Sequence, residues 1–321
     1  MKKYISAVIA VGTLLFIISI VAGRFDIVKE SFLQHKAYFF LIALTYAGGR
    51  LLDGLKLKVL VAKHGLKVKK IECFGLSFIM PLYNLMFPNA GQVTNALYLK
   101  SKYDFKFRNF VSVGLVRTII TVTSSGIIGI SAGILYMFQH KTFIMIYPII
   151  LYFVLICAAL ALFFILPEIK GMKKYRFLES MSGAFEGLKE VRKDPKLIGA
   201  LSVFQTGIIS LFILRYYIVF KALSFSASLA GIAAVIPMTA ISNLINIIPA
   251  NLAIREAVVS ASSMLIGFTP EQGILVAAID RSVILITLFF TGGWFFIRLR
   301  YFDNLILKKN IEGVGAGSDD V

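Results

Sequence analysis

Long apolar runs separated by short basic segments dominate this chain. Six of the runs are long enough to cross a bilayer as helices, and they cover Tyr4–Ala22, Ala37–Leu55, Phe110–Phe138, Phe143–Leu166, Leu197–Phe220 and Gly273–Ile297. The first run is longer than the apolar core of a secretory signal and no small-residue cleavage site follows it, so it is predicted to be a spanning helix. Since 58% of the 321 residues are hydrophobic, the pattern predicts an all-α polytopic membrane protein.

Two further apolar stretches are interrupted by Asn and Pro in the same way. The first reads Tyr-Asn-Leu-Met-Phe-Pro-Asn over residues 83–89, and the second carries Pro249 between Asn243 and Asn251. Their arms, 73–87 with 90–99 and 229–248 with 252–268, are short for full crossings. A break at membrane depth is tolerated only where it is buried or lines a cavity. The pattern therefore predicts two re-entrant broken-helix hairpins, with Pro88 and Pro249 at the breaks.

The distribution of basic residues predicts the orientation of these elements. With the N-terminus inside, cytoplasmic segments hold 24 of the 34 Lys and Arg residues and external segments hold five, as the positive-inside rule expects. The first hairpin then enters from the cytoplasm and the second from outside, so the halves form an inverted repeat. The expected organisation is a transmembrane domain over 1–302, with repeats at about 37–138 and 197–298 and an amphipathic cytoplasmic linker over 168–196. A largely disordered cytoplasmic tail is expected over 303–321.

Five arginines, and no lysine, are expected within the apolar segments. An ionised side chain at membrane depth is costly and usually marks a functional site, and the planar guanidinium suits phosphate or carboxylate. Arg50 and Arg215 lie near predicted helix ends, where they are expected to extend to the membrane interface. Arg117, Arg255 and Arg281 are expected to face a substrate site.

Acidic neighbours suggest pairing between helices. Glu256 follows Arg255 and Asp280 precedes Arg281, but adjacent helical positions do not face each other. The expected pairs are therefore Arg255 with Asp280 or Glu256 with Arg281, in a network that serves either structure or binding. Arg117 has no acidic partner in its own hairpin, so its expected partner is an anion.

The asparagines at the breaks point to the same kind of ligand. Asn89 and Asn251 are expected to cap new helices, and Asn84, Asn243 and Asn246 lie beside them. Helix N-termini inside the membrane favour anions, and a phosphate headgroup fits. Because His and Cys are scattered, no metal, cofactor or catalytic constellation is expected. Small residues Gly48, Gly49, Ser125, Gly129 and Gly133 are expected to serve helix packing.

The order of these motifs resembles a known family. Asn-Leu-Met-Phe-Pro-Asn-Ala-Gly at 84–91, Arg117, Arg255-Glu256 after Pro249, and Asp280-Arg281 are similar to the transmembrane region of lysylphosphatidylglycerol synthases, also called the flippase-like UPF0104 family. The resemblance covers about residues 1–302 and implies a lipid translocator with paired re-entrant hairpins. The family usually has Gly-Glu-x-x-Arg after the first proline, where this chain has Gly91-Gln92-Val93-Thr94-Asn95. No segment resembles the soluble aminoacyl-transferring domain, so synthase activity is not expected.

These features favour a flippase or transporter of an anionic phospholipid or lipid-linked intermediate in cell-envelope biogenesis, placed in the plasma membrane with both termini cytoplasmic. An alternative is a non-catalytic membrane subunit of a glycosyltransferase or polysaccharide assembly complex. An enzyme that transfers sugar from a lipid-linked donor is disfavoured, because loop carboxylates are sparse. The expected partners are a lipid with an anionic headgroup, a candidate glycosyltransferase and a second copy of the chain, and not nucleic acid.

Overall fold

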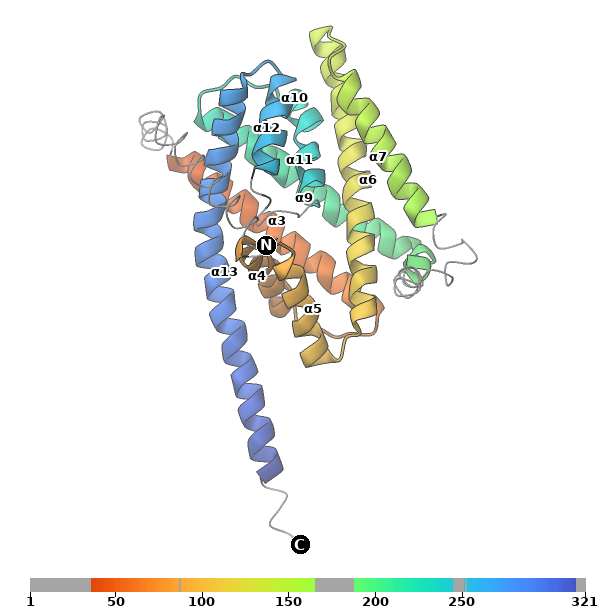
Figure 1. The fold of residues 1–321 in the computed structure, drawn as a ribbon, viewed down its shortest axis with the longest axis vertical. Helices are drawn as coiled ribbons and strands as arrows, with labels where there is room; N and C mark the ends of the chain where they lie inside the picture. Colours follow the sequence, from red (N-terminus) through yellow and green to blue (C-terminus); the bar gives the residue numbers. More distant parts are fainter. Residues whose placement is uncertain (1–35, 87, 165–187, 245–250, 252, 316–321) are drawn as a thin grey trace, which may run out of the picture.

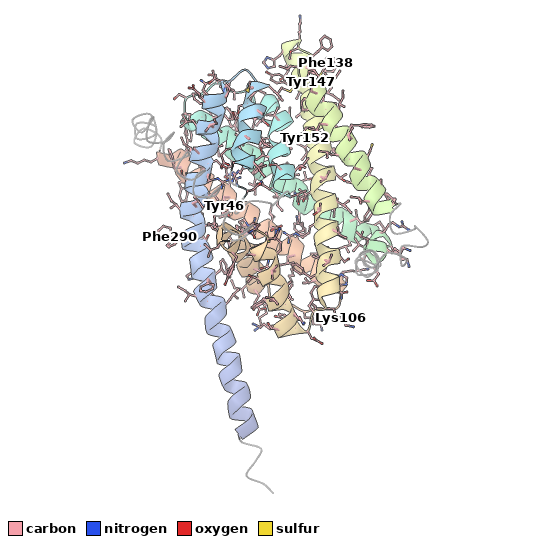
Figure 2. The ribbon with its side chains drawn as sticks, viewed as in Figure 1. Tyr46, Lys106, Phe138, Tyr147, Tyr152 and Phe290 are labelled. Carbon is pink, nitrogen blue, oxygen red and sulfur yellow. The ribbon has the colours of Figure 1, made fainter. Side chains whose placement is uncertain are left out.

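Large apolar side chains cover the outside of the molecule, as expected for helices that face lipid. In the computed structural model Phe138, Tyr147 and Phe290 are 80%, 73% and 73% exposed and lie on three different helices (Figure 2). The structure describes residues 36–86, 88–164, 188–244, 251 and 253–315, and regular structure in these ranges is helical. Four helices among them are long and apolar enough to cross a membrane. The predicted all-α membrane protein is therefore confirmed.

The described helices follow the predicted order closely. They are α3 (Lys36–Lys63), α4 (Lys70–Met86), α5 (Ala90–Tyr103), α6 (Phe107–His140), α7 (Ile146–Phe164), α9 (Pro195–Ala222), α10 (Leu229–Val235), α11 (Pro237–Ser242), α12 (Ile254–Met264) and α13 (Pro270–Gly315). The predicted first crossing and most of the linker, residues 165–187, lie outside the described ranges. The part of the linker at 188–192 is helical, and Leu188 and Val191 pack in the core.

Two helices extend further than predicted. α3 continues to Lys63, past the expected end near Leu55, and α13 continues to Gly315, past Ile297. Neither extension contains a proline, and α13 meets no glycine between Gly293 and Gly313, so nothing in the local sequence terminates the backbone hydrogen bonding. Much of the tail that was predicted to be disordered is thus helical.

α3 and α9 run alongside each other through the middle of the molecule (Figure 1). Glycines allow this close contact, because a Cβ atom on Gly48 would lie 3.3 Å from Leu211 and one on Gly207 would lie 3.1 Å from Leu52. At one end Lys63 donates to Asp194 at 2.9 Å. This ammonium, together with a hydrogen bond from the Leu197 amide, lowers the pKa of the Asp194 carboxyl. Packing at Gly48 is as predicted, whereas Gly49 borders a cavity described below.

The two broken segments occupy different parts of the fold. α4 and α5 lie below α10, α11 and α12 in Figure 1. The arm expected over Leu229–Ile248 is not one helix, because α10 ends at Val235 and α11 begins at Pro237. Proline has no N–H to donate and its ring displaces the preceding turn. Short paired helices are therefore present in both halves, while their entry from opposite membrane faces stays a prediction.

α6 and α7 pack tightly through small residues, as predicted. A Cβ atom on Gly129 would lie 2.3 Å from the Tyr152 ring, and one on Gly133 would lie 3.1 Å from Ile149. Ser125 in the same stripe is fully buried. The stripe therefore lets α7 approach α6 closely, and this places Tyr152 against the second half of the molecule.

Replacing Tyr152 by Phe is expected to destabilise the protein by about 1–3 kcal/mol, because a buried backbone carbonyl would lose its hydrogen bond. The Tyr152 hydroxyl donates to the Ala234 carbonyl at 3.0 Å, in the last turn of α10 beside the break at Pro237. Unfolding in detergent, followed by circular dichroism, measures the loss. Tyr147→Phe on the same helix is the control, since Tyr147 is 73% exposed. Equal stability of the two variants would contradict the role of Tyr152.

Candidate functional site

A cavity of about 570 Å3 lies between the two halves of the molecule, and both broken segments border it. Asn84 and Asn89 line it from the first break, and Asn243 and Asn251 line it from the second. The five arginines that were singled out in the apolar segments also line it, namely Arg50, Arg117, Arg215, Arg255 and Arg281. The fold therefore brings the predicted arginines and breaks together around one space.

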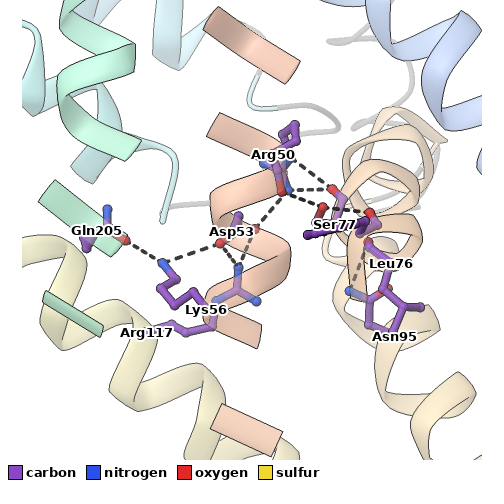
Figure 3. Close-up of polar contacts among 9 residues, drawn as sticks. Arg50, Asp53, Lys56, Leu76, Ser77, Asn95, Arg117 and Gln205 are labelled. Carbon is purple, nitrogen blue, oxygen red and sulfur yellow. Dashed lines mark hydrogen bonds and ion pairs between the residues drawn. The ribbon is translucent and has the colours of Figure 1, made fainter. Parts of the chain in front are cut away.

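On one side of the cavity, cationic side chains surround a single carboxylate. Arg50, Asp53 and Lys56 recur at every third position of α3 and so share a face of the helix, and Arg117 reaches them from α6. Arg117 Nη2 lies 2.6 and 2.7 Å from the two Asp53 carboxylate oxygens. Arg50 Nη2 lies 3.1 Å and Lys56 Nζ 3.4 Å from the same carboxylate (Figure 3). These four residues are called the Asp53 cluster.

The structure corrects three predictions about the Asp53 cluster. Arg50 does not extend to the interface, because its Nε and Nη2 donate to the Ser77 carbonyl of α4 at 3.0 and 2.7 Å (Figure 3). Lys56 directly follows the predicted crossing Ala37–Leu55 and was therefore expected among the cytoplasmic basic residues, but α3 continues beyond it and it is 3% exposed. The expectation that no lysine is buried was therefore wrong. Arg117, for which no acid was found in its own predicted hairpin and whose expected partner was therefore an anion, pairs with Asp53 of α3.

On the other side of the cavity, arginines from two helices converge on Asp280. Asp280 of α13 is fully buried, with Oδ1 2.7 Å from Arg215 Nε of α9 and Oδ2 accepting from Arg255 Nη2 of α12. Arg255 also donates to the Tyr216 hydroxyl at 3.2 Å. These residues, together with an ion pair of 2.6 Å between Arg281 Nε and Glu256 Oε1, are called the Asp280 cluster.

Both predicted pairs between helices are present in the Asp280 cluster. Arg255 pairs with Asp280, and Glu256 pairs with Arg281, so α12 is held to α13 twice. Arg215 was expected to extend to the interface, and this was wrong. Its side chain is 7% exposed, and its guanidinium lies 4.7 Å from the centroid of the Phe212 ring. Stacking on an aromatic face stabilises a buried guanidinium.

The asparagines close the breaks through their backbone conformation and hydrogen bonds. Asn89 and Asn251 have φ values of 61° and 55°, in the left-handed region that Asn tolerates better than most residues. Asn84 Oδ1 accepts from the Gly91 amide at 2.8 Å, and Asn251 Nδ2 donates to the Ser242 carbonyl at 3.0 Å. Asn243 Oδ1 accepts from Asn251 at 3.4 Å.

The predicted helix caps are only partly present. Asn89 precedes α5 directly, but its side chain makes no capping hydrogen bond. α12 begins at Ile254, so the capping position falls on Ala253 and not on Asn251. Ala253 has a φ of 68°, a conformation that costs an L-residue free energy and is often found at functional sites. Asn246 and Pro249 lie outside the described residues, and Pro88 lies in the turn between α4 and α5.

Gln92 and Asn95, the neutral residues noted after the first proline, have separate roles. Gln92 lines the cavity, whereas Asn95 is 2% exposed and donates to the Leu76 carbonyl of α4 at 3.4 Å (Figure 3). The segment of α4 and α5 therefore contributes polar but uncharged groups to the cavity. Over the part of the chain that the structure describes, no group of three or more His, Cys, Asp and Glu side chains could hold a metal ion.

Asp53, Lys56 and Gln205 were not singled out from the sequence. Lys56 donates to Gln205 Oε1 of α9, which joins the two central helices beside the cavity. The spacing Arg50-x-x-Asp53-x-x-Lys56 is a signal that could have found two of them, because three charged residues on one face of an otherwise apolar helix rarely face lipid.

The fold and the site thus define a polytopic α-helical membrane protein with a basic cavity between its two halves. The sequence model of the lysylphosphatidylglycerol synthase transmembrane region matches residues 5–292, and the chain belongs to this family. Neither a curated protein nor a solved structure matches it.

Proposed function

We propose that this protein moves a lipid with an anionic headgroup across the membrane through the cavity between its two halves. The observation that carries the proposal is the convergence of all five of these arginines, from α3, α6, α9, α12 and α13, on one cavity. Removing each cation from water costs on the order of several kcal/mol, and a paired carboxylate offsets this cost only where the geometry is favourable. A chain that keeps so many in one place uses them for an anionic ligand.

The residues that line the cavity suit the headgroup of a lipid better than a whole lipid molecule. Polar groups from both breaks, Asn84, Asn89, Asn243 and Asn251, line the same cavity as the arginines. Apolar side chains such as Phe289 and Phe290 on α13 are 72% and 73% exposed on the outside. The headgroup would occupy the cavity while its acyl chains stay in the surrounding lipid.

The expected cycle follows from an inverted repeat. If the two hairpins enter from opposite faces, rocking one half against the other exposes the cavity to each leaflet in turn. Arg117, Arg255 and Arg281 would hold the phosphate, and Glu256 and Asp280 would keep the second half assembled. In this proposal the protein is a transporter and not an enzyme, it lies in the plasma membrane with both termini cytoplasmic, and membrane-bound glycosyltransferases remain candidate partners.

Reconstitution in vesicles tests the proposal. Translocation of fluorescent phospholipids, detected by the exposure of their headgroups to a reductant outside the vesicle, is compared for the wild type and Arg117→Ala. Arg117→Ala leaves Asp53 paired with Arg50 and Lys56, so the fold should survive. We expect the variant to be at least about tenfold slower, the effect of one lost charged hydrogen bond.

Lys100→Ala provides the matched control, because Lys100 is an exposed cation on α5 away from the cavity. It should translocate lipid at the wild-type rate. An Arg117→Ala protein that is folded and as fast as the wild type would refute the anion site. Wild-type protein that moves no lipid would favour the role of an accessory subunit.

A further inference from the structure

The charges around the cavity do not balance. Among the described lining residues, six side chains are cationic, namely Arg50, Lys56, Arg117, Arg215, Arg255 and Arg281, and Asp53 is the one carboxylate. Asp280 and Glu256 add two carboxylates directly behind the wall, each in contact with a lining arginine. Within the described part of the chain, six cations and three carboxylates thus leave three positive charges in a largely buried site.

Most of the surplus lies in the Asp53 cluster. In the Asp280 cluster three arginines meet two carboxylates, and each arginine contacts one of them. In the Asp53 cluster Arg50, Lys56 and Arg117 all share one carboxylate. The Arg50 and Arg117 side chains are 18% and 20% exposed, more than those of Arg215, Arg255 and Arg281. A ligand in the cavity therefore meets a local charge of two.

A phosphodiester supplies too little charge for this site. It carries one negative charge, which would leave one cation of the Asp53 cluster and one of the Asp280 cluster uncompensated. A terminal phosphate monoester carries about 1.5 to 2 negative charges at pH 7 and three acceptor oxygens, and a diphosphate carries more. The guanidinium groups match these oxygens in planar pairs, and Lys56 adds a point charge.

Building on the proposed function, we infer that the cavity selects lipids whose headgroup ends in a phosphate with two or more negative charges. Lys56 is the specificity residue. Its Nζ lies 3.4 Å from Asp53 and donates to Gln205, so it adds the third cation to a carboxylate that Arg50 and Arg117 already neutralise. Without Lys56 the surplus of the Asp53 cluster falls to one charge, which a phosphodiester satisfies.

Binding of two lipids that differ by one methyl group tests this selectivity. The probes are dioleoyl phosphatidic acid, which ends in a phosphate monoester, and dioleoyl phosphatidylmethanol, in which a methyl group removes the second charge. The full chain in detergent micelles is titrated with each lipid, and binding is followed by thermal stabilisation. We expect phosphatidic acid to bind at least about tenfold tighter, the effect of one further charge-assisted hydrogen bond.

Lys56→Gln should reduce this preference to less than about threefold, since the amide keeps a hydrogen bond to Gln205 and removes only the charge. Lys58→Gln, two residues along α3 and outside the cavity lining, should keep the wild-type preference. The same probes in vesicles should be translocated in the same order. Equal binding of the two lipids by the wild type, or an unchanged preference in Lys56→Gln, would overturn the inference.

Two further comparisons distinguish a failure of the inferred selectivity from a failure of the proposed function, and a lipid ligand from a free anion. If phosphatidylmethanol is translocated at least as fast as phosphatidic acid, and Arg117→Ala slows both, the transporter proposal stands and the selectivity is wrong. If neither lipid moves, the transporter proposal fails by itself. Inorganic pyrophosphate is titrated in parallel. Thermal stabilisation by pyrophosphate without binding of phosphatidic acid would overturn the inference that the ligand is a lipid.

Discussion

Asp280→Asn is expected to lower the free energy of unfolding by about 3–5 kcal/mol, the usual cost of removing one partner from a buried ion pair. Asp280 is fully buried, and both of its carboxylate oxygens face arginines, Arg215 on one side and Arg255 on the other. The amide would leave two guanidinium groups without a counter-charge at membrane depth. Unfolding by denaturant in mixed micelles, followed by helical circular dichroism, measures the loss.

Two further variants isolate the electrostatic cause. Asp104→Asn is the control, because Asp104 is exposed in the turn after α5 with a φ of 51°, which Asn adopts readily; its stability should stay within roughly 0.5 kcal/mol of the wild type. Combining Asp280→Asn with Arg215→Gln should recover part of the loss, since one uncompensated charge is removed. An unchanged unfolding midpoint in Asp280→Asn would show that the arginines do not depend on this carboxylate.

Asp53→Asn is expected to have two opposite effects. Stability without ligand should fall, also by about 3 kcal/mol or more, because Arg50, Lys56 and Arg117 lose their common carboxylate. Stabilisation by an anionic lipid should rise, because the ligand no longer competes with Asp53 for these cations. Thermal unfolding at increasing phosphatidic acid concentration separates the two effects, since ligand stabilisation grows with concentration relative to the dissociation constant.

The control for Asp53→Asn is Asp194→Asn. Asp194 also pairs with a lysine, Lys63, but both side chains are about one-third exposed and lie away from the cavity. This variant should change the response to phosphatidic acid little. If Asp53→Asn instead loses its response to the lipid, then Asp53 positions the arginines for binding, and the idea that it competes with the ligand is wrong.

Sequence patterns alone predicted most of the helical segments and the break between α4 and α5. Apolar runs that exceed the bilayer thickness, and the Asn and Pro residues at 84–89, are local signals, because helix formation and its interruption depend on neighbouring backbone groups. The pairs of Arg255 with Asp280 and of Glu256 with Arg281 were also predictable, since few acids are available in the apolar segments of that half.

Tertiary structure decided what the cations contact. Arg117 and Asp53 are 64 residues apart, and Lys56 and Gln205 are 149 residues apart. Whether such side chains meet depends on the rotation of each helix about its axis and on the distance between the two helices. For α3 and α9, packing at residues such as Gly48 and Gly207 determines this rotation and this distance. A charged residue near a predicted helix end is expected at the membrane interface as long as the position of the neighbouring helix is unknown. For this reason the sequence placed Arg50 and Arg215 at the membrane interface and Lys56 in a cytoplasmic segment, whereas the structure places all three in the cavity wall.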